Sequence, residues 1–343
     1  MRISIFAAIW CQNLWDELIL KNEIEHFEKK YKKEGQEVEF RVCTYDIKKP
    51  FFTKENVTYV EYFPIGSREG NRKRNLKNYI TFLKTVFWSD LIIIWGGGLF
   101  YDSELQKWDR TLDLRLFRTK HFRFFHKKFN FYAISIDVKK EKNLKKIYKI
   151  FKGANKMYVR DEYSRKLLFE MKFNAHEIDD PVFFDNPAYS PKHRSLIKVL
   201  NSKNFSLKDF KDIDIEGKRI GLAFRPGYLS LSNNKDIEVA KIWELIHFLI
   251  GNGARKLVFL PHSIHPHDQQ ANDYHFLKQF LSPKVDVLDS IGDVYDAYKL
   301  KKIDLCFAMR LHSIILSEVY HIPYIALSYS QKTDEVIKKI THM

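Results

Sequence analysis

Short runs of consecutive apolar residues alternate along this chain with longer segments in which apolar residues recur every three or four positions. Such runs are typical of parallel strands buried on both faces, and the periodic segments are typical of helices that cover a sheet. The chain opens with the run RISIFAAIW over 2–10, followed by a helical pattern over about 16–32. In the first half, the same alternation predicts strands over 38–44, 91–98, 131–137, 156–161 and 176–183, and a helix over 76–86.

The pattern changes between residues 186 and 215, where prolines, serines and asparagines are frequent and the strand signal is weak. We interpret this stretch as a linker or a crossing helix. The alternation then resumes and predicts strands over 219–226, 256–263, 285–289, 303–310 and 324–329, and helices over about 236–250 and 273–280.

Regular alternation of strands and helices predicts an α/β fold with parallel sheets and right-handed crossovers. Because 343 residues exceed one ordinary core, we expect two Rossmann-like domains. The predicted boundaries are 1–185 for the amino-terminal domain, 186–215 for the linker and 216–343 for the carboxy-terminal domain.

The composition is that of a globular protein, with 45% hydrophobic and 29% charged residues. A formal net charge of +15 favours contact with phosphates, carboxylates, nucleic acid or an anionic membrane surface. The charge does not choose among these partners, and many of the lysines can simply solvate the surface.

The three cysteines, Cys11, Cys43 and Cys306, are odd in number and far apart, so neither a disulfide framework nor a zinc site is predicted. No run approaches 18 apolar residues, and no cleavage pattern of a secretory signal follows the first strand. We therefore expect a cytoplasmic protein.

Candidate binding residues stand where predicted strands end, because ligands of parallel sheets bind beyond the carboxyl ends of the strands. Gly97 and Gly98 end the run over 91–98, where they either let backbone N–H groups approach an anion or serve a tight turn alone. Arg160 ends a later strand, where it either points at a ligand or pairs with a neighbouring carboxylate.

Two further strands, in the second half, end at Arg225 and His262. His265 and His267 follow His262, but this spacing on a loop with a proline is weak support for a metal ion, so no metal site is predicted.

The segment 303–332 carries the strongest chemical signal. Arg310 and His312 open a helix directly after a strand, where the helix dipole and the free amides favour an anion. Arginine can bind a phosphate or carboxylate through two N–H groups, and histidine can move a proton near neutral pH. Ser328 and Lys332 follow the next strand and are expected to line the same rim.

These motifs resemble those of the polysaccharide pyruvyltransferases of bacterial cell-wall polymer and exopolysaccharide synthesis. NLWDELIL over 13–20 is similar to the N-x-G-D-E-x-x-L segment of that family, and GGGLF with Asp102 is similar to its glycine tract. VRDEYS and DPVF look like its middle motifs. RLHSIILSEVYHIPYIALSYSQK over 310–332 resembles its carboxy-terminal signature.

The resemblance implies a GT-B-like fold with an active-site cleft between an acceptor-side amino-terminal domain and a donor-side carboxy-terminal domain. It also implies transfer of the pyruvyl group of phosphoenolpyruvate to a sugar of a polysaccharide or lipid-linked glycan precursor, which ends as a pyruvate ketal. Three features depart from the family. Trp15 replaces a glycine, AISID over 133–137 replaces a glycine-rich stretch, and the chain stops soon after Ile340, which leaves little room for a closing helix.

Under this hypothesis, phosphoenolpyruvate is a co-substrate and no cofactor is required. The predicted phosphoenolpyruvate-binding residues are Arg160, Arg225, Arg310, Lys332, Ser328, Gly97 and Gly98. His312 is predicted to act as general acid or base beside Arg310, with His262 as the second candidate. The predicted acceptor contacts are Asn13, Asp16 and Glu17, although Asp16 can equally cap a helix.

Residues 114–129, LRLFRTKHFRFFHKKF, combine basic and aromatic side chains without an acid. Such a segment can lie on an anionic bilayer at the inner face of the membrane, or it can form an amphipathic helix that packs its phenylalanines on the sheet.

Two rival functions are a nucleotide-sugar glycosyltransferase of the same architecture and a non-catalytic protein that binds anions or nucleic acid. The second domain lacks an E-x7-E pairing, which counts against the first rival. The basic residues are spread along the chain without a nucleic-acid motif, so no nucleic-acid partner is predicted.

Overall fold

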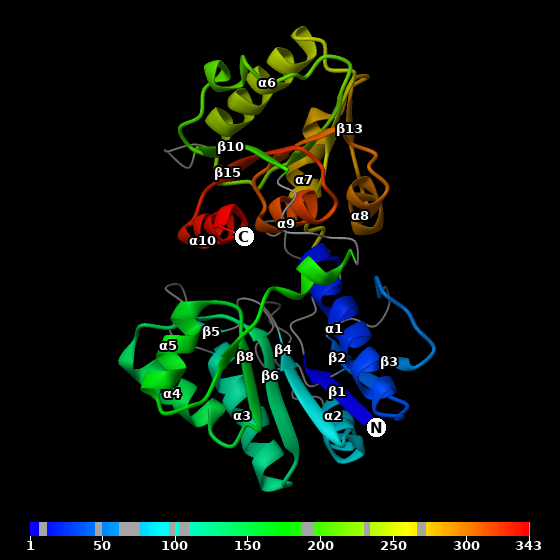
Figure 1. Ribbon diagram of the computed structural model, residues 1–343, viewed down its shortest axis with the longest axis vertical. Helices are drawn as coiled ribbons and strands as arrows, with labels where there is room; N and C mark the ends of the chain where they lie inside the picture. The colour runs from blue at the N-terminus through cyan, green and yellow to red at the C-terminus, as the bar shows by residue number, and fades with distance from the viewer. Residues whose placement is uncertain are drawn as a thin grey trace. The chain divides into compact units, whose positions relative to one another are not determined.

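The computed structural model describes residues 1–6, 12–44, 50–61, 76–95, 100–102, 110–186, 195–229, 234–265 and 272–342. The chain divides into two compact units. Unit 1 comprises Met1–Cys11 and Asp16–Pro181, and unit 2 comprises Gln12–Trp15 and Val182–Met343. Each unit holds a parallel sheet with helices packed against it, which confirms the predicted α/β class (Figure 1). The cleft between the domains stays a prediction.

The sheet of unit 1 has the strand order β3-β2-β1-β4-β6-β8-β9, and all neighbouring strands are parallel. Its strands are β1 (Arg2–Phe6), β2 (Glu39–Thr44), β3 (Val57–Glu61), β4 (Leu91–Trp95), β6 (Lys128–Ile134), β8 (Lys156–Val159) and β9 (His176–Glu177). Two short strands, β5 (Phe100–Tyr101) and β7 (Ile136–Asp137), pair separately.

Helices cover both faces of this sheet. They are α1 (Leu14–Lys33), α2 (Leu76–Trp88), α3 (Arg110–Phe124), α4 (Glu141–Phe151) and α5 (Glu162–Glu170). Successive side chains of a strand point to opposite faces. Accordingly, Phe131 of β6 stacks on Phe151 of α4 with ring centroids 4.0 Å apart, whereas Tyr132 packs on Phe27 of α1 at 5.3 Å.

The sheet of unit 2 has the order β10-β15-β14-β11-β12-β13 and is also entirely parallel. Its strands are β10 (Leu196–Asn201), β11 (Arg219–Ala223), β12 (Lys256–Phe259), β13 (Val285–Val287), β14 (Leu305–Ala308) and β15 (Tyr324–Ser328). From β11 the chain proceeds to β12 and β13 on one side, then crosses to β14 on the other. The strand order therefore reverses between β11 and β14, which is where open α/β sheets bind ligands.

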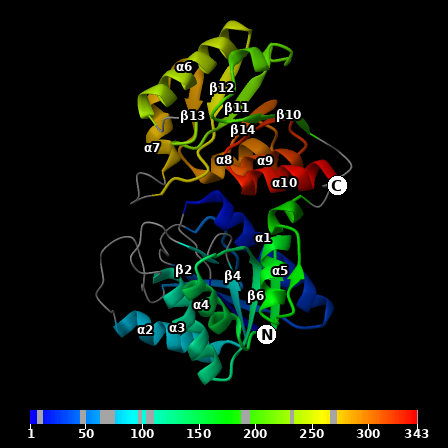
Figure 2. The same cartoon turned by 90° about the vertical axis from the view of Figure 1, so that its left-hand side faces the viewer.

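The helices of unit 2 lie on both faces of this sheet, with α6 on one face and α9 and α10 on the other (Figures 1 and 2). They are α6 (Lys235–Gly251), α7 (Asp273–Leu277), α8 (Ile291–Lys299), α9 (Leu311–Val319) and α10 (Gln331–His342), with short 3-10 helices at η1 (Pro181–Phe184), η2 (Leu207–Phe210) and η4 (Lys278–Phe280). The core between α6, α7 and the sheet is aliphatic and aromatic, and includes Leu245, Leu249, Phe259 and Phe280.

Three elements differ from the sequence predictions. The stretch 186–215 was expected to be a linker or a crossing helix, but it contains the edge strand β10 and η2. The strand predicted over 176–183 is only the two-residue β9, because Pro181 cannot donate a ladder hydrogen bond and begins η1 instead. The expectation of little room for a closing helix is wrong, since α10 spans Gln331–His342.

Cys43 and Cys306 are buried thiols without a disulfide, and burial raises the pKa of each to about 12. Each is therefore protonated and packs as a small apolar side chain. Cys11 lies outside the described residues. None of the helices in the described parts of the chain is long and apolar enough to cross a membrane.

Candidate functional site

The residues predicted to carry chemistry in the second half meet at the carboxyl edge of the unit 2 sheet. Arg225 follows β11 and Arg310 follows β14, the two strands on either side of the order reversal. The backbone N–H of Arg310 donates to the Ala223 carbonyl at 3.2 Å, and the backbone N–H of Arg225 donates to the Met309 sulfur at 3.2 Å. These contacts bring both arginine backbones to the same point of the sheet.

We use the name carboxyl-edge cluster for the polar and aromatic residues gathered there, which are Arg225, His262, Asp273, Arg310, His312 and Tyr329.

Arg310 is held by a buried carboxylate. Its guanidinium donates from Nη2 to Asp273, whose side chain is only 1% exposed, while the Arg310 side chain is 17% exposed. Burial raises the pKa of the Asp273 carboxyl, and the charge of Arg310 opposes that rise. The buried Nε–H of Arg310 has no hydrogen-bond partner among the described residues. Arg310 is thus fixed in direction, and its side chain as a whole stays partly exposed.

Arg225 is held by aromatic rings. Its guanidinium carbon lies 4.5 Å from the ring centroid of Tyr228 and 5.5 Å from that of Tyr329, and Nη1 donates to the Tyr329 hydroxyl at 3.2 Å. Burial alone would lower the pKa of Arg225, but Tyr329, Tyr228 and the charge of Asp273 together outweigh it and the net shift is upward. Arg225 forms no ion pair with a carboxylate of the described residues, so it remains a cation that an anionic ligand can neutralise.

His312 lies in the first turn of α9 beneath an indole ring. The Trp15 and His312 rings stack with centroids 3.5 Å apart and planes 16° from parallel, and Trp15 is 4% exposed. The residues Gln12–Trp15 belong to unit 2 because they pair with the loop after β12. Leu14 N–H donates to the His262 carbonyl at 3.0 Å, and Ile264 N–H donates to the Gln12 carbonyl at 2.9 Å.

His262, predicted as a second acid–base candidate, is enclosed. Its ring is 1% exposed, and Nε2 shares a 3.0 Å hydrogen bond with the Tyr298 hydroxyl. Burial, aided by the nearby charge of Arg310, lowers the pKa of His262 to about 3. The ring is therefore neutral at physiological pH, which favours a structural role over proton transfer.

Besides the arginines, the structure describes only the side chain of Ser328 among the predicted donor contacts. Ser328 ends β15 and is 7% exposed, and its hydroxyl donates to Asp334 of α10 at 2.5 Å. Lys332 lies in α10, but its side chain is outside the described part of the chain, as are Gly97 and Gly98. Their roles stay predictions.

Arg160, a predicted donor contact, lies in unit 1 at the end of β8. Its Nη1 donates to Asp180 Oδ2 at 2.6 Å, and Nη2 donates to the Ser135 hydroxyl at 3.2 Å. The side chains of Arg160 and Asp180 are 5% and 11% exposed. The ion pair joins the VRDEYS and DPVF motifs, and it favours the alternative in which Arg160 pairs with a neighbouring carboxylate.

The predicted acceptor contacts are divided between the units. Asn13 belongs to unit 2, where its side-chain oxygen accepts from the Trp15 N–H at 3.2 Å and so caps the start of α1. Asp16 and Glu17 belong to unit 1. Asp16 is half-buried and Glu17 is fully buried. Exposure therefore favours Asn13 and Asp16 over Glu17 as groups that touch a ligand.

Sequence reasoning missed three residues that hold the cluster together: Asp273, Tyr228 and Tyr298. Asp273 follows Asn272, which caps α7, so its sequence context indicates only an ordinary helix start. Tyr228 and Tyr298 lie outside the sequence motifs that indicate a binding site. Trp15 was noted as a departure from the family pattern, but nothing in the sequence indicates that it lies on His312.

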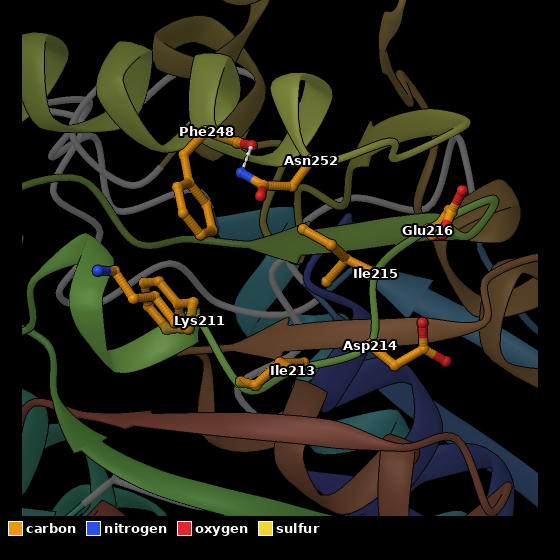
Figure 3. Close-up of a pocket in the computed structure, with 8 residues that line it drawn as sticks. Lys211, Ile213, Asp214, Ile215, Glu216, Phe248 and Asn252 are labelled. Atoms are coloured by element: carbon orange, nitrogen blue, oxygen red, sulfur yellow. Dashed lines mark hydrogen bonds between the residues drawn. The ribbon is translucent and has the colours of Figure 1, made fainter.

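A separate depression in unit 2 lies at the other edge of the sheet, since residues 210–216 precede β11 and Arg225 follows it (Figure 3). It has a volume of about 210 Å³ and is lined by Phe210, Lys211, Ile213, Asp214, Ile215, Glu216, Phe248 and Asn252. It contains none of the predicted site residues. Within the described parts of the chain, no group of three or more His, Cys, Asp and Glu side chains could hold a metal ion.

Two guanidinium groups and an imidazole at the order reversal of a parallel sheet define an α/β protein equipped to bind an anionic ligand. The family model described as polysaccharide pyruvyl transferase matches residues 16–331. The chain belongs to the polysaccharide pyruvyl transferase family and is a transferase at the level of that family.

Solved structures resemble the chain at low sequence identity. The UDP-GlcNAc 2-epimerase of Methanocaldococcus jannaschii is 11% identical over 100% of this chain and 92% of that chain, with a TM-score of 0.49. The α,α-trehalose 6-phosphate synthase of Burkholderia multivorans is 9% identical over 100% of this chain and 89% of that chain, with a TM-score of 0.41. No curated protein sequence matches the chain significantly.

Proposed function

We propose that the protein transfers the pyruvyl group of phosphoenolpyruvate to a sugar of a polysaccharide or lipid-linked glycan precursor, forms a cyclic pyruvate ketal and releases phosphate. Membership of the pyruvyl transferase family supports the transferred group. The observation that carries the donor assignment is the pair Arg225 and Arg310 at the order reversal of the sheet, with His312 two residues after Arg310.

Phosphoenolpyruvate carries a phosphate and a carboxylate, and each matches the two parallel N–H groups of a guanidinium. Arg310 is oriented by Asp273, and Arg225 is oriented by Tyr228 and Tyr329. Because both side chains are already fixed, little conformational entropy is lost when the donor binds. Ser328, Lys332, Gly97 and Gly98 complete the donor contacts in this proposal.

The reaction needs two proton transfers that balance. A proton added to the methylene carbon of phosphoenolpyruvate makes the central carbon electrophilic, and one sugar hydroxyl adds there and loses its proton. The bond from the central carbon to the phosphate oxygen then breaks, and a second hydroxyl of the same sugar adds and closes the ketal. The two sugar hydroxyls release two protons in all. One balances the proton added to the methylene carbon, and the other ends on the released phosphate. No metal or cofactor is consumed.

His312 is the residue that we assign to proton transfer. An imidazole can donate to the methylene carbon and later accept from a hydroxyl near neutral pH. The stack on Trp15 fixes the plane of the ring, and a π face stabilises the protonated form of a cation placed over it. Asn13 and Asp16 are assigned to acceptor hydroxyls.

The test is to incubate the full chain with phosphoenolpyruvate or with nucleotide sugars, each with candidate lipid-linked N-acetylhexosamines. We expect acceptor-dependent phosphate release with phosphoenolpyruvate only, and a product heavier by one ketal-linked pyruvate. Consumption of a nucleotide sugar, with no phosphate released from phosphoenolpyruvate, would refute the proposal and favour the glycosyltransferase alternative.

A further inference from the structure

We propose that unit 1 binds an anionic lipid bilayer through an aromatic and basic surface at the ends of α2 and α3. We call it the aromatic-basic patch and define it by Phe87, Phe124, Phe125, Lys84 and Lys120. It extends the proposed function, because a bilayer surface is where a lipid-linked acceptor is found.

The aromatic part of the patch is exposed and contiguous. Phe124 is 76% exposed and Phe87 is 55% exposed, although both are large apolar side chains. The ring of Phe125 lies between them, with centroids 4.6 Å from Phe87 and 5.0 Å from Phe124. Single exposed apolar residues are common on soluble proteins, but three touching phenylalanine rings mark an interaction surface.

The fold explains why these rings meet. The helices α2 and α3 lie side by side, as the Tyr79–Phe117 and Phe82–Phe117 ring contacts show (Figure 2). They lead into the neighbouring strands β4 and β6, so their carboxyl ends arrive at the same edge of the sheet. Lys127 ties the two ends together by donating to the carbonyls of Phe87 and Ser89, each at 2.9 Å.

The charge around the rings is positive. Lys84 lies one helical turn from Phe87, and Lys120 lies one turn from Phe124. Both lysines are exposed, and neither forms an ion pair among the described residues. The acids nearest in sequence are already engaged, since Asp90 pairs with Arg2 at 3.1 Å and Asp113 pairs with Lys146 at 2.6 Å. Aromatic rings that enter the headgroup boundary, ringed by lysines, are the pattern of interfacial membrane binding.

The patch is not the whole segment 114–129 that the sequence suggested. Arg115 and Arg118 are buried, and their guanidinium carbons lie 5.0 Å from the Phe100 ring and 5.7 Å from the Phe6 ring. Two of the basic residues of the segment therefore stabilise the interior of unit 1. The membrane surface is instead formed by the end of α3 together with Phe87 and Lys84 of α2.

A bilayer fits the patch better than a second copy of the chain does. A symmetric dimer would place the patch against itself and bring its lysines together, which like-charge repulsion opposes. The patch lies at the amino-terminal edge of the unit 1 sheet, before β4 and β6 begin, so it leaves the carboxyl edge of that sheet uncovered. Docking would therefore anchor the enzyme without blocking that edge.

The experiment is cosedimentation of the full chain with vesicles of phosphatidylcholine alone or with about 30% phosphatidylglycerol, without donor or acceptor. We expect binding to the phosphatidylglycerol vesicles that weakens with added salt. The double variant Phe87→Ser, Phe124→Ser is expected to bind at least about tenfold more weakly. The double variant K84E/K120E is expected to lose binding by a similar factor or more.

Matched controls separate the patch from general effects. Phe169 of α5 is 73% exposed and lies outside the patch, so Phe169→Ser should bind vesicles like the parent chain. The double variant K208E/K284E makes the same charge change at exposed lysines of unit 2 and should retain most of the binding.

Three results would overturn the proposal: equal binding to phosphatidylcholine, equal losses in patch and control variants, or a dimer abolished by the phenylalanine changes without any vesicle binding. Because no donor is present, these results leave the transfer reaction untouched. Phosphate release from phosphoenolpyruvate with a soluble acceptor is expected to be the same in the patch variants, and this measurement tests the proposed function separately.

Discussion

The two sheets of this protein hold their motif arginines in different ways at their carboxyl edges. In unit 1, Arg160 is buried in an ion pair with Asp180 and adds a hydrogen bond to Ser135. In unit 2, the Arg225 guanidinium contacts the rings of Tyr228 and Tyr329 and has no carboxylate partner among the described residues. Arg310 pairs with the buried Asp273, but its side chain is 17% exposed, against 5% for Arg160.

The motifs of one family can therefore carry two kinds of arginine. One with all its charge compensated by a buried acid fixes the chain path, since removing either partner leaves an unpaired buried charge. Arg225, which is oriented by aromatic rings, keeps its charge for a ligand. Arg310 combines a buried acid partner with a side chain that stays partly exposed. Experiments can separate the two kinds. Replacing the first should lower the free energy of unfolding, and replacing the second should lower kcat/KM for phosphoenolpyruvate.

Replacing Arg160 by glutamine tests the structural half of this comparison. We expect the free energy of unfolding to fall by about 3–5 kcal/mol, since Asp180 would be left buried without its partner. Urea denaturation followed by fluorescence measures the change. Protein that remains folded should retain most of its transfer rate, and a large rise in KM for phosphoenolpyruvate at unchanged stability would instead place Arg160 in the donor site.

Replacing Arg225 by glutamine tests the other half. We expect kcat/KM for phosphoenolpyruvate to fall by about 100-fold, because one of the two guanidinium groups for the donor is lost. The free energy of unfolding should change by less than about 1 kcal/mol, since no buried carboxylate is left unpaired. Arg225→Lys keeps the charge without the two parallel N–H groups and should give an intermediate rate. A parent-like kcat/KM for Arg225→Gln would contradict the assignment of Arg225 to the donor site.

Much of the fold could be predicted from the sequence, because buried strands such as β4 and β14 are uninterrupted apolar runs. The edge strand β10 could not, since its side chains alternate between half-buried and exposed and the signal for a buried strand is absent. At the site, Arg225, Arg310 and His312 could be predicted because they follow strands. The pairing of Arg310 with Asp273 could not, since it joins residues 37 positions apart with no local signature.

The pH dependence of stability tests whether the buried His262 ring stays unprotonated in the folded protein. The pKa of His262 in the folded state is about 3, below the usual value of 6.5, so the unfolded chain binds more protons between these two pH values. Stability from this residue is therefore complete above pH 6.5 and lost as the pH falls toward 3. We expect the free energy of unfolding to be about 2 kcal/mol lower at pH 5 than at pH 7 from this group alone.

The measurement is a pair of denaturant curves at the two pH values for the parent chain and for His262→Gln, which cannot titrate. The pH-dependent difference should shrink by that amount in the variant. An identical pH dependence would show that His262 is accessible to protons in the folded state, which would restore it as an acid–base candidate.

The smallest effect is expected at Trp15. Trp15→Leu removes the π face stacked on His312 and should lower kcat/KM by about fivefold, because the protonated ring loses roughly 1 kcal/mol of stabilisation. The pH at which the rate falls on the alkaline side should move downward by up to about one unit. Trp15→Phe retains a ring and should restore both values in part. A lower rate with an unchanged pH profile would reduce Trp15 to a packing role.

In the proposed reaction, the imidazole of His312, beside Arg310, performs the proton transfer from and to the substrates of a phosphoenolpyruvate-dependent transfer. The most direct measurement is acceptor-dependent phosphate release from phosphoenolpyruvate by His312→Ala, with its folding checked by circular dichroism and with the parent chain alongside. We expect kcat to fall by about 100-fold or more, with the KM for phosphoenolpyruvate little changed. A folded His312→Ala protein that releases phosphate at the parent rate would contradict this role of His312.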